Sequence, residues 1–239
     1  MIVLLGTCLC DTFFTISAFL AFYGLHKLYV KNSNSFSVLD ILKIYLKRYL
    51  RLAPLALATL AFGMYVMPFM HGDKDDKNDP IWFTFFEVLF YRCDNNEEIL
   101  SKIFFYSNLQ PSLQDDKDLC MGWSWFYECE MQLFLLAPLL VLFYSKCGRR
   151  VSYFVFMAVI IAGVFINYRS IYKYHITAGI FSMENYYMYS NFINKPWYKL
   201  PNYFLGVLCA VFFQDYLEYH RLLSINDPGF KEFQIIHFF

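Results

Sequence analysis

The chain of 239 residues is 58% hydrophobic and 22% aromatic, and its mean hydropathy is +0.37. These values are too apolar for a soluble domain of this length and place the chain in a lipid bilayer. Basic and acidic residues number 20 each, so the charge supports neither a nucleic acid nor an acidic protein as partner, and we expect no nucleic-acid partner. The seven cysteines and five histidines form no pair or cluster with metal-ligand spacing, so we also expect no metal.

The first apolar segment, residues 2–23, has the ~20 residues that a membrane-spanning helix needs. It carries Asp11 near its middle and Ser17 one to two turns later. A carboxyl group at that depth costs ~2.5–3.5 kcal/mol on insertion scales, so Asp11 should face the protein interior and find a partner. A structural role, capping a break in the helix, is the alternative, and the residues leave both open.

Residues 38–51 have the helical spacing of an amphipathic helix lying on the membrane surface. At Pro54 this helix is predicted to turn into a second span over residues 52–70. Arg48 and Arg51 are three residues apart, so they share a helix face at the mouth of that span. Two planar guanidinium groups there could hold a phosphate or carboxylate, although basic residues beside a span are commonly orientation anchors.

Three more spans are predicted, over residues 122–144, 151–167 and 201–216. Glu128, Glu130 and Gln132 lie in the first of them, at a depth where polar groups are costly and usually functional. For Glu128 the alternative, a position near enough to the surface to be solvated, stays open. The predicted fold is an all-α integral membrane protein, a polytopic bundle of about five transmembrane helices with interfacial amphipathic helices. We expect one domain over residues 1–239, in a multi-pass protein whose organelle the sequence does not indicate.

Charge is distributed unevenly between the segments that join the spans. Residues 71–121 form one acidic extramembranous loop with eleven acids and five basic residues, whereas 24–51 and 145–150 together carry nine basic residues and one acid. The positive-inside rule therefore places the two basic segments, with the arginine pair, in the cytosol and the acidic loop in the lumen or exterior. Cys93 and Cys120 then lie in an oxidising space, where a disulfide between them is a candidate.

Five short stretches occur in a fixed order along the chain: Asp11 to Leu20, Arg48 to Pro54, Cys93 to Cys120 around Phe105-Tyr106-Ser107-Asn108, Trp123 to Pro138, and Lys195-Pro196-Trp197 with Asn202 to Gly206. Together they resemble the acyltransferase-3 family of integral membrane acyltransferases, especially its nose-resistant-to-fluoxetine-like branch. No single stretch is specific, but the ordered set is.

The resemblance implies transfer of an acyl group from a cytosolic acyl-CoA donor to an acceptor, with Arg48 and Arg51 on the donor phosphates and membrane lipids around the protein. The family's first helix, with its catalytic His, and its C-terminal helices have no counterpart here, so a partial or truncated member is expected. Its catalytic residue is therefore unassigned, because His26 falls at the cytosolic end of the first span. Glu130 replaces the Asp that the family usually carries.

Two alternatives remain open at this point. A chain without the family's base could be a catalytically degenerate, structural subunit of a larger membrane complex, with other membrane subunits as partners. A transporter or channel lined by Asp11, Glu128 and Glu130 would also explain acids within the membrane, but no repeat architecture supports it.

Overall fold

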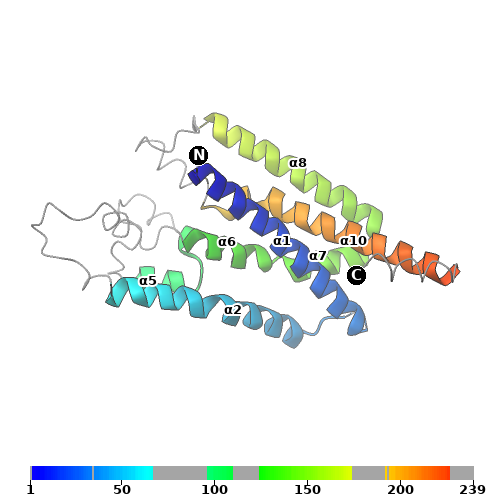
Figure 1. Cartoon of the computed structure of the whole chain (residues 1–239), viewed down its shortest axis with the longest axis horizontal. Helices are drawn as coiled ribbons and strands as arrows, with labels where there is room; N and C mark the ends of the chain where they lie inside the picture. The colour runs from blue at the N-terminus through cyan, green and yellow to red at the C-terminus, as the bar shows by residue number, and fades with distance from the viewer. Residues whose placement is uncertain are drawn as a thin grey trace, which may run out of the picture.

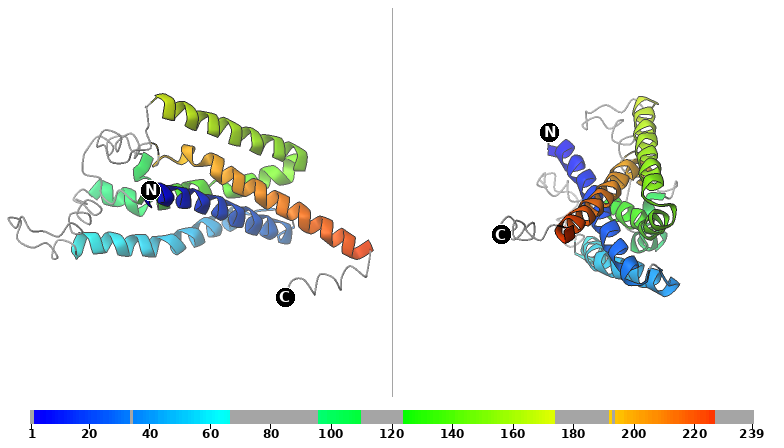
Figure 2. Two further views of the ribbon diagram at one scale, coloured as in Figure 1. Left: turned by 45° about the horizontal axis from the view of Figure 1, so that its top comes forward. Right: turned by 90° about the vertical axis from the view of Figure 1, so that its right-hand side faces the viewer.

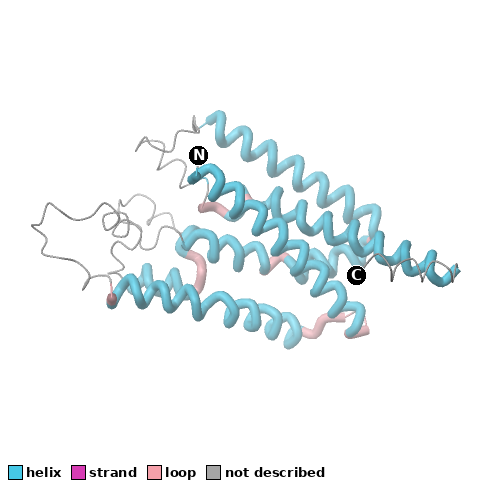
Figure 3. Tube along the Cα trace, in the orientation of Figure 1, coloured by secondary structure: helices cyan, strands magenta, loops and turns pink. Residues whose placement is uncertain are grey.

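The computed structural model describes residues 2–33, 35–66, 96–109, 124–173, 192 and 194–226. Within these ranges the chain is built from helices and has no strand, as Figure 3 shows. The elements are α1 (Ile2–Lys31), α2 (Val38–Tyr65), α5 (Asn96–Ile103), α6 (Trp125–Phe134), α7 (Ala137–Cys147), α8 (Arg149–Lys173) and α10 (Leu200–Asn226), with the 3-10 turns η1 (Ser107–Leu109) and η3 (Pro196–Tyr198). The all-α prediction is confirmed.

Helices α1 and α10 form the centre of the bundle, with α8 along one edge and α2 along the opposite edge (Figures 1 and 2). The most extensive contact in the described part of the chain is between α1 and α10. Gly206 makes this close approach possible, since a Cβ atom there would lie 2.1 Å from the backbone oxygen of Thr15. The buried core lies between α1, α7, α8 and α10, and it includes Phe14, Phe22, Val141, Phe156, Tyr203 and Val207.

The prediction for residues 38–70 was wrong in one respect. Instead of a surface helix followed by a turn into a span, α2 is one continuous helix of 28 residues with Pro54 inside it. A proline removes one backbone donor, which a helix held by tertiary packing can tolerate. Ser37 is the residue before the helix, and its backbone N–H donates to Asp40 Oδ2 at 3.2 Å, as expected of a helix start.

The span predicted over residues 122–144 is also interrupted, because α6 ends at Phe134 and α7 begins at Ala137. Pro138 lies in the first turn of α7, where its missing N–H costs least. The Tyr45 hydroxyl of α2 donates to the Leu135 carbonyl oxygen at 2.9 Å, which satisfies an acceptor at this break. The interruption thereby becomes an attachment point for α2.

Three helical stretches in the described residues are long and apolar enough to cross a membrane: Cys10–Lys31, Trp125–Cys147 and Arg149–Lys173. They correspond to three of the five predicted spans, and the total number stays a prediction. The segments that join α1 to α2 and α7 to α8 lie at one end of the bundle, whereas α5 and the start of α6 lie at the other (Figure 1). The residues that join α1 to α2 and those that join α7 to α8 thus share one end, as the predicted sidedness requires, whereas Arg48 and Arg51 lie ten and thirteen residues into α2, away from that end.

Candidate functional site

The side chains of Ser17, Arg48 and Glu130 meet where α1, α2 and α6 come together. We call these three residues the central cluster. Arg48 Nη2 donates to Ser17 Oγ at 2.8 Å and forms an ion pair with Glu130 Oε1, which also accepts a hydrogen bond from the Ser17 hydroxyl. The side chains of Arg48 and Glu130 are 17% and 7% exposed, so the pair is largely removed from solvent. Such a pair is stable only when hydrogen bonds support it, as Ser17 does here.

The central cluster lies deep in the bundle. Ser17 is fifteen residues after the start of α1 and fourteen before its end, which is about 20 Å from either end. Arg48 is ten residues into α2, about 15 Å from its first residue. The guanidinium carbon of Arg48 also lies 4.7 Å from the ring centroid of Phe134, a cation–π contact that helps to hold the group in place.

Arg51 differs from Arg48 in its surroundings, although both were predicted to share one helix face. Its side chain is exposed, and within the described residues no hydrogen bond or ion pair engages it. The two arginines therefore differ: Arg48 binds protein groups, whereas Arg51 presents an exposed guanidinium group. The assignment of both to donor phosphates stays a prediction.

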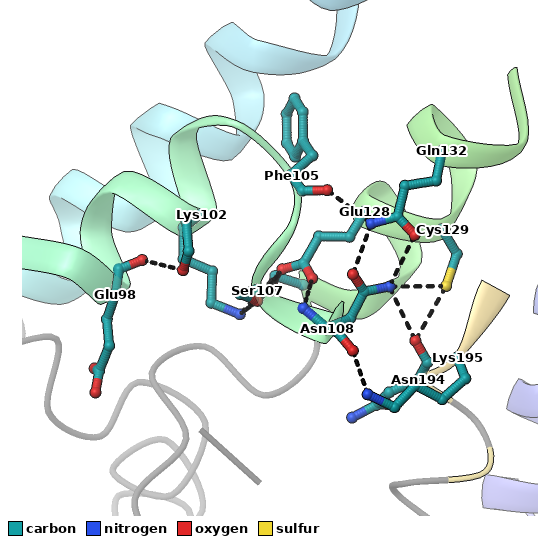
Figure 4. Close-up of polar contacts among 12 residues, drawn as sticks. Glu98, Lys102, Phe105, Ser107, Asn108, Glu128, Cys129, Gln132, Asn194 and Lys195 are labelled. Carbon is teal, nitrogen blue, oxygen red and sulfur yellow. Dashed lines mark hydrogen bonds and ion pairs between the residues drawn. The ribbon is translucent and has the colours of Figure 1, made fainter. Parts of the chain in front are cut away.

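A second polar network surrounds Glu128, on the opposite side of α6. The alternative that Glu128 is solvated near the surface is excluded, because its side chain is 1% exposed. Oε1 accepts from Ser107 Oγ at 2.6 Å and Ser124 Oγ at 2.8 Å, and it lies 3.1 Å from Lys102 Nζ. Oε2 accepts from the Asn108 backbone N–H at 2.7 Å. Figure 4 shows Glu128 among Lys102, Ser107 and Asn108. The donors around Glu128 replace the water that a buried carboxylate loses.

Gln132 extends this network toward η3. Its Nε2 donates to Asn108 Oδ1 at 2.6 Å and to the Phe105 carbonyl oxygen at 2.9 Å, while Asn108 Nδ2 donates back to Gln132 Oε1 at 3.2 Å. The Lys195 ammonium donates to the Asn108 carbonyl oxygen. Burial lowers the pKa of Lys195, although the neighbouring Cys129 and Glu128 act in the opposite direction. The network thus joins η1, α6 and the residues before α10.

Asp11 pairs with a residue that the sequence did not single out. Lys199, just before α10, places Nζ 2.8 Å from Asp11 Oδ1, and their side chains are 7% and 36% exposed. Nearby, the Thr15 hydroxyl donates to the Asn202 carbonyl oxygen at 3.1 Å. Of the intramembrane residues predicted from the sequence, Ser17 and Glu130 come together, whereas Asp11 and Gln132 belong to two other sets of contacts.

Other sequence predictions fall outside these contacts. Cys93 and Cys120 lie outside the described residues, so their proposed disulfide stays a prediction. His26 packs on aromatic rings, with ring centroids 6.3 Å from Phe22 and 5.5 Å from Tyr144. Across the described ranges, no group of three or more His, Cys, Asp or Glu side chains gathers as a metal site would need.

Comparison with known proteins decides the family. The family model Acyl_transf_3, described as "Acyltransferase domain", matches residues 1–226. The chain belongs to the acyltransferase-3 family. It is also similar to "Nose resistant to fluoxetine protein 6" of Caenorhabditis elegans, with 26% identity over 153 residues, which cover 59% of this chain and 16% of that protein. The chain thus spans less than a fifth of that relative's length, and no solved structure matches it.

The central cluster joins three of the five stretches that resemble this family. Ser17, Arg48 and Glu130 each come from a different stretch, and the fold brings the three side chains into direct contact. Lys102 and Lys199 were missed because neither stands out in the sequence: each is one lysine among many, and its partner is far away in the chain. Tyr203 was part of a quoted stretch but was not assigned a role.

Proposed function

We propose that this member of the acyltransferase-3 family transfers an acyl group from a cytosolic acyl-CoA to an acceptor, as part of a membrane protein. The observation that carries the proposal is the central cluster: a charged, hydrogen-bonded group about halfway through the bundle, built from the family's own stretches. Acyl transfer between a cytosolic donor and an acceptor across the membrane needs polar groups halfway through the bundle. Polar groups are costly at this depth, so their presence there points to a function.

Arg51 is the stronger candidate for the donor phosphates in this proposal. Its guanidinium group is exposed, and a planar fork of donors suits a phosphate better than a lysine ammonium does. Arg48 already pairs with Glu130, so its guanidinium group is the less available of the two for a phosphate. The donor enters from the end of the bundle at which α2 begins, because the basic segments lie there.

Membrane lipids complete the surroundings in this proposal. Large apolar side chains project from α8, including Phe154, Ile161 and Phe165, which are 79%, 64% and 58% exposed. These exposures are what a helix at the edge of a membrane bundle shows, because lipid chains take the place of a protein neighbour.

The test uses the full-length protein in membranes and a panel of acyl-CoA thioesters from acetyl to palmitoyl. Release of the free thiol of coenzyme A is followed, with membranes lacking the protein as the background. We expect protein-dependent thiol release, and we expect Arg51→Ala to raise the KM for the acyl-CoA about tenfold, since charge-assisted hydrogen bonds contribute about 1.5–3 kcal/mol.

The matched control is Arg150→Ala, which removes an exposed arginine at the basic end of the bundle. It should leave the KM within about twofold of wild type, as expected of an arginine that only orients the protein. Equal changes in KM in the two variants would show that Arg51 only orients the protein in the membrane. If the wild-type protein releases no thiol and purifies in fixed stoichiometry with other membrane subunits, the proposed acyl transfer is wrong and the structural role is favoured.

A further inference from the structure

Buried polar atoms without partners mark a second feature of the central cluster. Arg48 Nε and Glu130 Oε2 are both buried, and within the described residues neither has a hydrogen-bond partner. They belong to the two groups that are joined through Arg48 Nη2 and Glu130 Oε1, so the unpartnered atoms lie beside that contact. Native proteins leave few such atoms, and each one calls for an explanation.

Tyr203 adds a third unpartnered atom from the opposite helix, α10. Its side chain is 1% exposed, and its hydroxyl oxygen has no hydrogen-bond partner among the described residues. The carbonyl oxygen of the preceding residue, Asn202, accepts a hydrogen bond from the Thr15 hydroxyl at 3.1 Å, and a Cβ atom on Gly206 would lie 2.9 Å from the Cβ atom of Ala18. This part of α10 therefore packs against the part of α1 that carries Ser17. A tyrosine hydroxyl buried in this way usually has a partner, and phenylalanine would fill the same core position without a polar cost.

The three atoms have complementary roles. Arg48 Nε and the Tyr203 hydroxyl are donors, whereas Glu130 Oε2 is an acceptor. Acyl transfer needs fixed donors for the carbonyl oxygen, which becomes negatively charged in the tetrahedral intermediate, and an acceptor for the hydrogen of the attacking hydroxyl. A buried site makes such donors more effective, because water does not compete with them.

We infer that Tyr203 is a catalytic residue whose hydroxyl, together with Arg48 Nε, binds the carbonyl oxygen of the thioester and stabilises its negative charge during transfer. This inference rests on the proposed function. The acceptor's oxygen forms the new bond to the carbonyl carbon while the π electrons move onto the carbonyl oxygen. These electrons return to the carbon–oxygen bond as the C–S bond breaks. The proton of the acceptor hydroxyl ends on the departing sulfur, and Glu130 Oε2 is the nearby hydrogen-bond acceptor for that proton.

The test is Tyr203→Phe in the full-length protein, measured with the acyl-CoA that gives the fastest thiol release. We expect kcat to fall about 100-fold with little change in KM, because removing one oxyanion donor typically costs 10²–10³ in kcat. Thermal stability should be unchanged or slightly higher, since the variant removes a buried hydroxyl that no protein group satisfies.

Tyr153→Phe is the matched control. Its hydroxyl donates to Asp215 Oδ2 at 2.8 Å, near the end of the bundle where α8 begins, so its loss should lower stability slightly and leave kcat within about twofold. A kcat of Tyr203→Phe equal to wild type, or a fall in kcat that follows a loss of thermal stability, overturns the inference alone and leaves water as the partner of the hydroxyl. A wild-type protein without thioester turnover overturns it together with the proposed function.

Discussion

Removing the carboxylate of Glu130 while Arg48 stays in place should destabilise the bundle strongly. In Glu130→Gln the side chain keeps its shape, but the guanidinium group loses its counter-ion in a site where the two side chains are only 7% and 17% exposed. Breaking a buried ion pair costs about 3–5 kcal/mol, because one charge is left without compensation. The residual exposure of Arg48 favours the lower end, so we expect a loss of about 3 kcal/mol in the free energy of unfolding.

The double variant Arg48→Met/Glu130→Leu separates this explanation from a simple loss of contacts. With both charges gone, no unpaired ion is left, and we expect the free energy of unfolding to lie within about 1 kcal/mol of wild type. Denaturant titration in detergent micelles, followed by tryptophan fluorescence, gives both values. The single variants Arg48→Met and Glu130→Leu complete the cycle. If the double variant loses as much free energy of unfolding as these two single variants added together, the two residues act independently and the ion pair in the central cluster has no energetic role.

Two further predictions concern other parts of the chain. Gly206→Ala should lower the melting temperature markedly, because its Cβ would lie 2.1 Å from the backbone oxygen of Thr15. Gly24→Ala is the control and should not lower it, since no atom lies within 4 Å of a Cβ at that position. Equal melting temperatures of the two variants would show that α1 and α10 do not approach as closely as the structure has them. Alkylation of the intact protein without reductant should leave Cys93 and Cys120 unlabelled, because a disulfide has no free thiol. Labelling of both cysteines would show that the predicted disulfide does not form.

The long helices could be predicted from the sequence, whereas the continuity of α2 and the break between α6 and α7 could not. Long apolar runs predicted α1, α8 and α10 because burial in lipid requires them. Apolar residues at helical spacing, with basic residues between them, predict a surface helix over residues 38–51, and Leu39, Leu42 and Leu46 are indeed 64%, 62% and 55% exposed. Local composition does not show that Tyr45 and Arg48 tie this segment to α6, so the continuity of α2 was missed.

The partners of the buried charges were harder to predict than their burial. The cost of a charge in the membrane made it necessary that Asp11 and Glu130 find partners. The choice of partner depends on contacts far apart in the chain: Lys199 is 188 residues from Asp11, and Arg48 is 82 residues from Glu130. A single sequence contains no local pattern for such pairs, which arise only when the helices pack.

Glu128 and Glu130 show how the same residue type on one helix can serve two purposes. They are two residues apart, so they point to opposite faces of α6. Every oxygen of Glu128 has protein donors, which suits a group that fixes η1 and the start of α6. Glu130 has one oxygen bound and one that is buried without a hydrogen-bond partner among the described residues. Native folds leave few buried polar atoms without partners, and for that reason we propose the reaction on Glu130's side of α6.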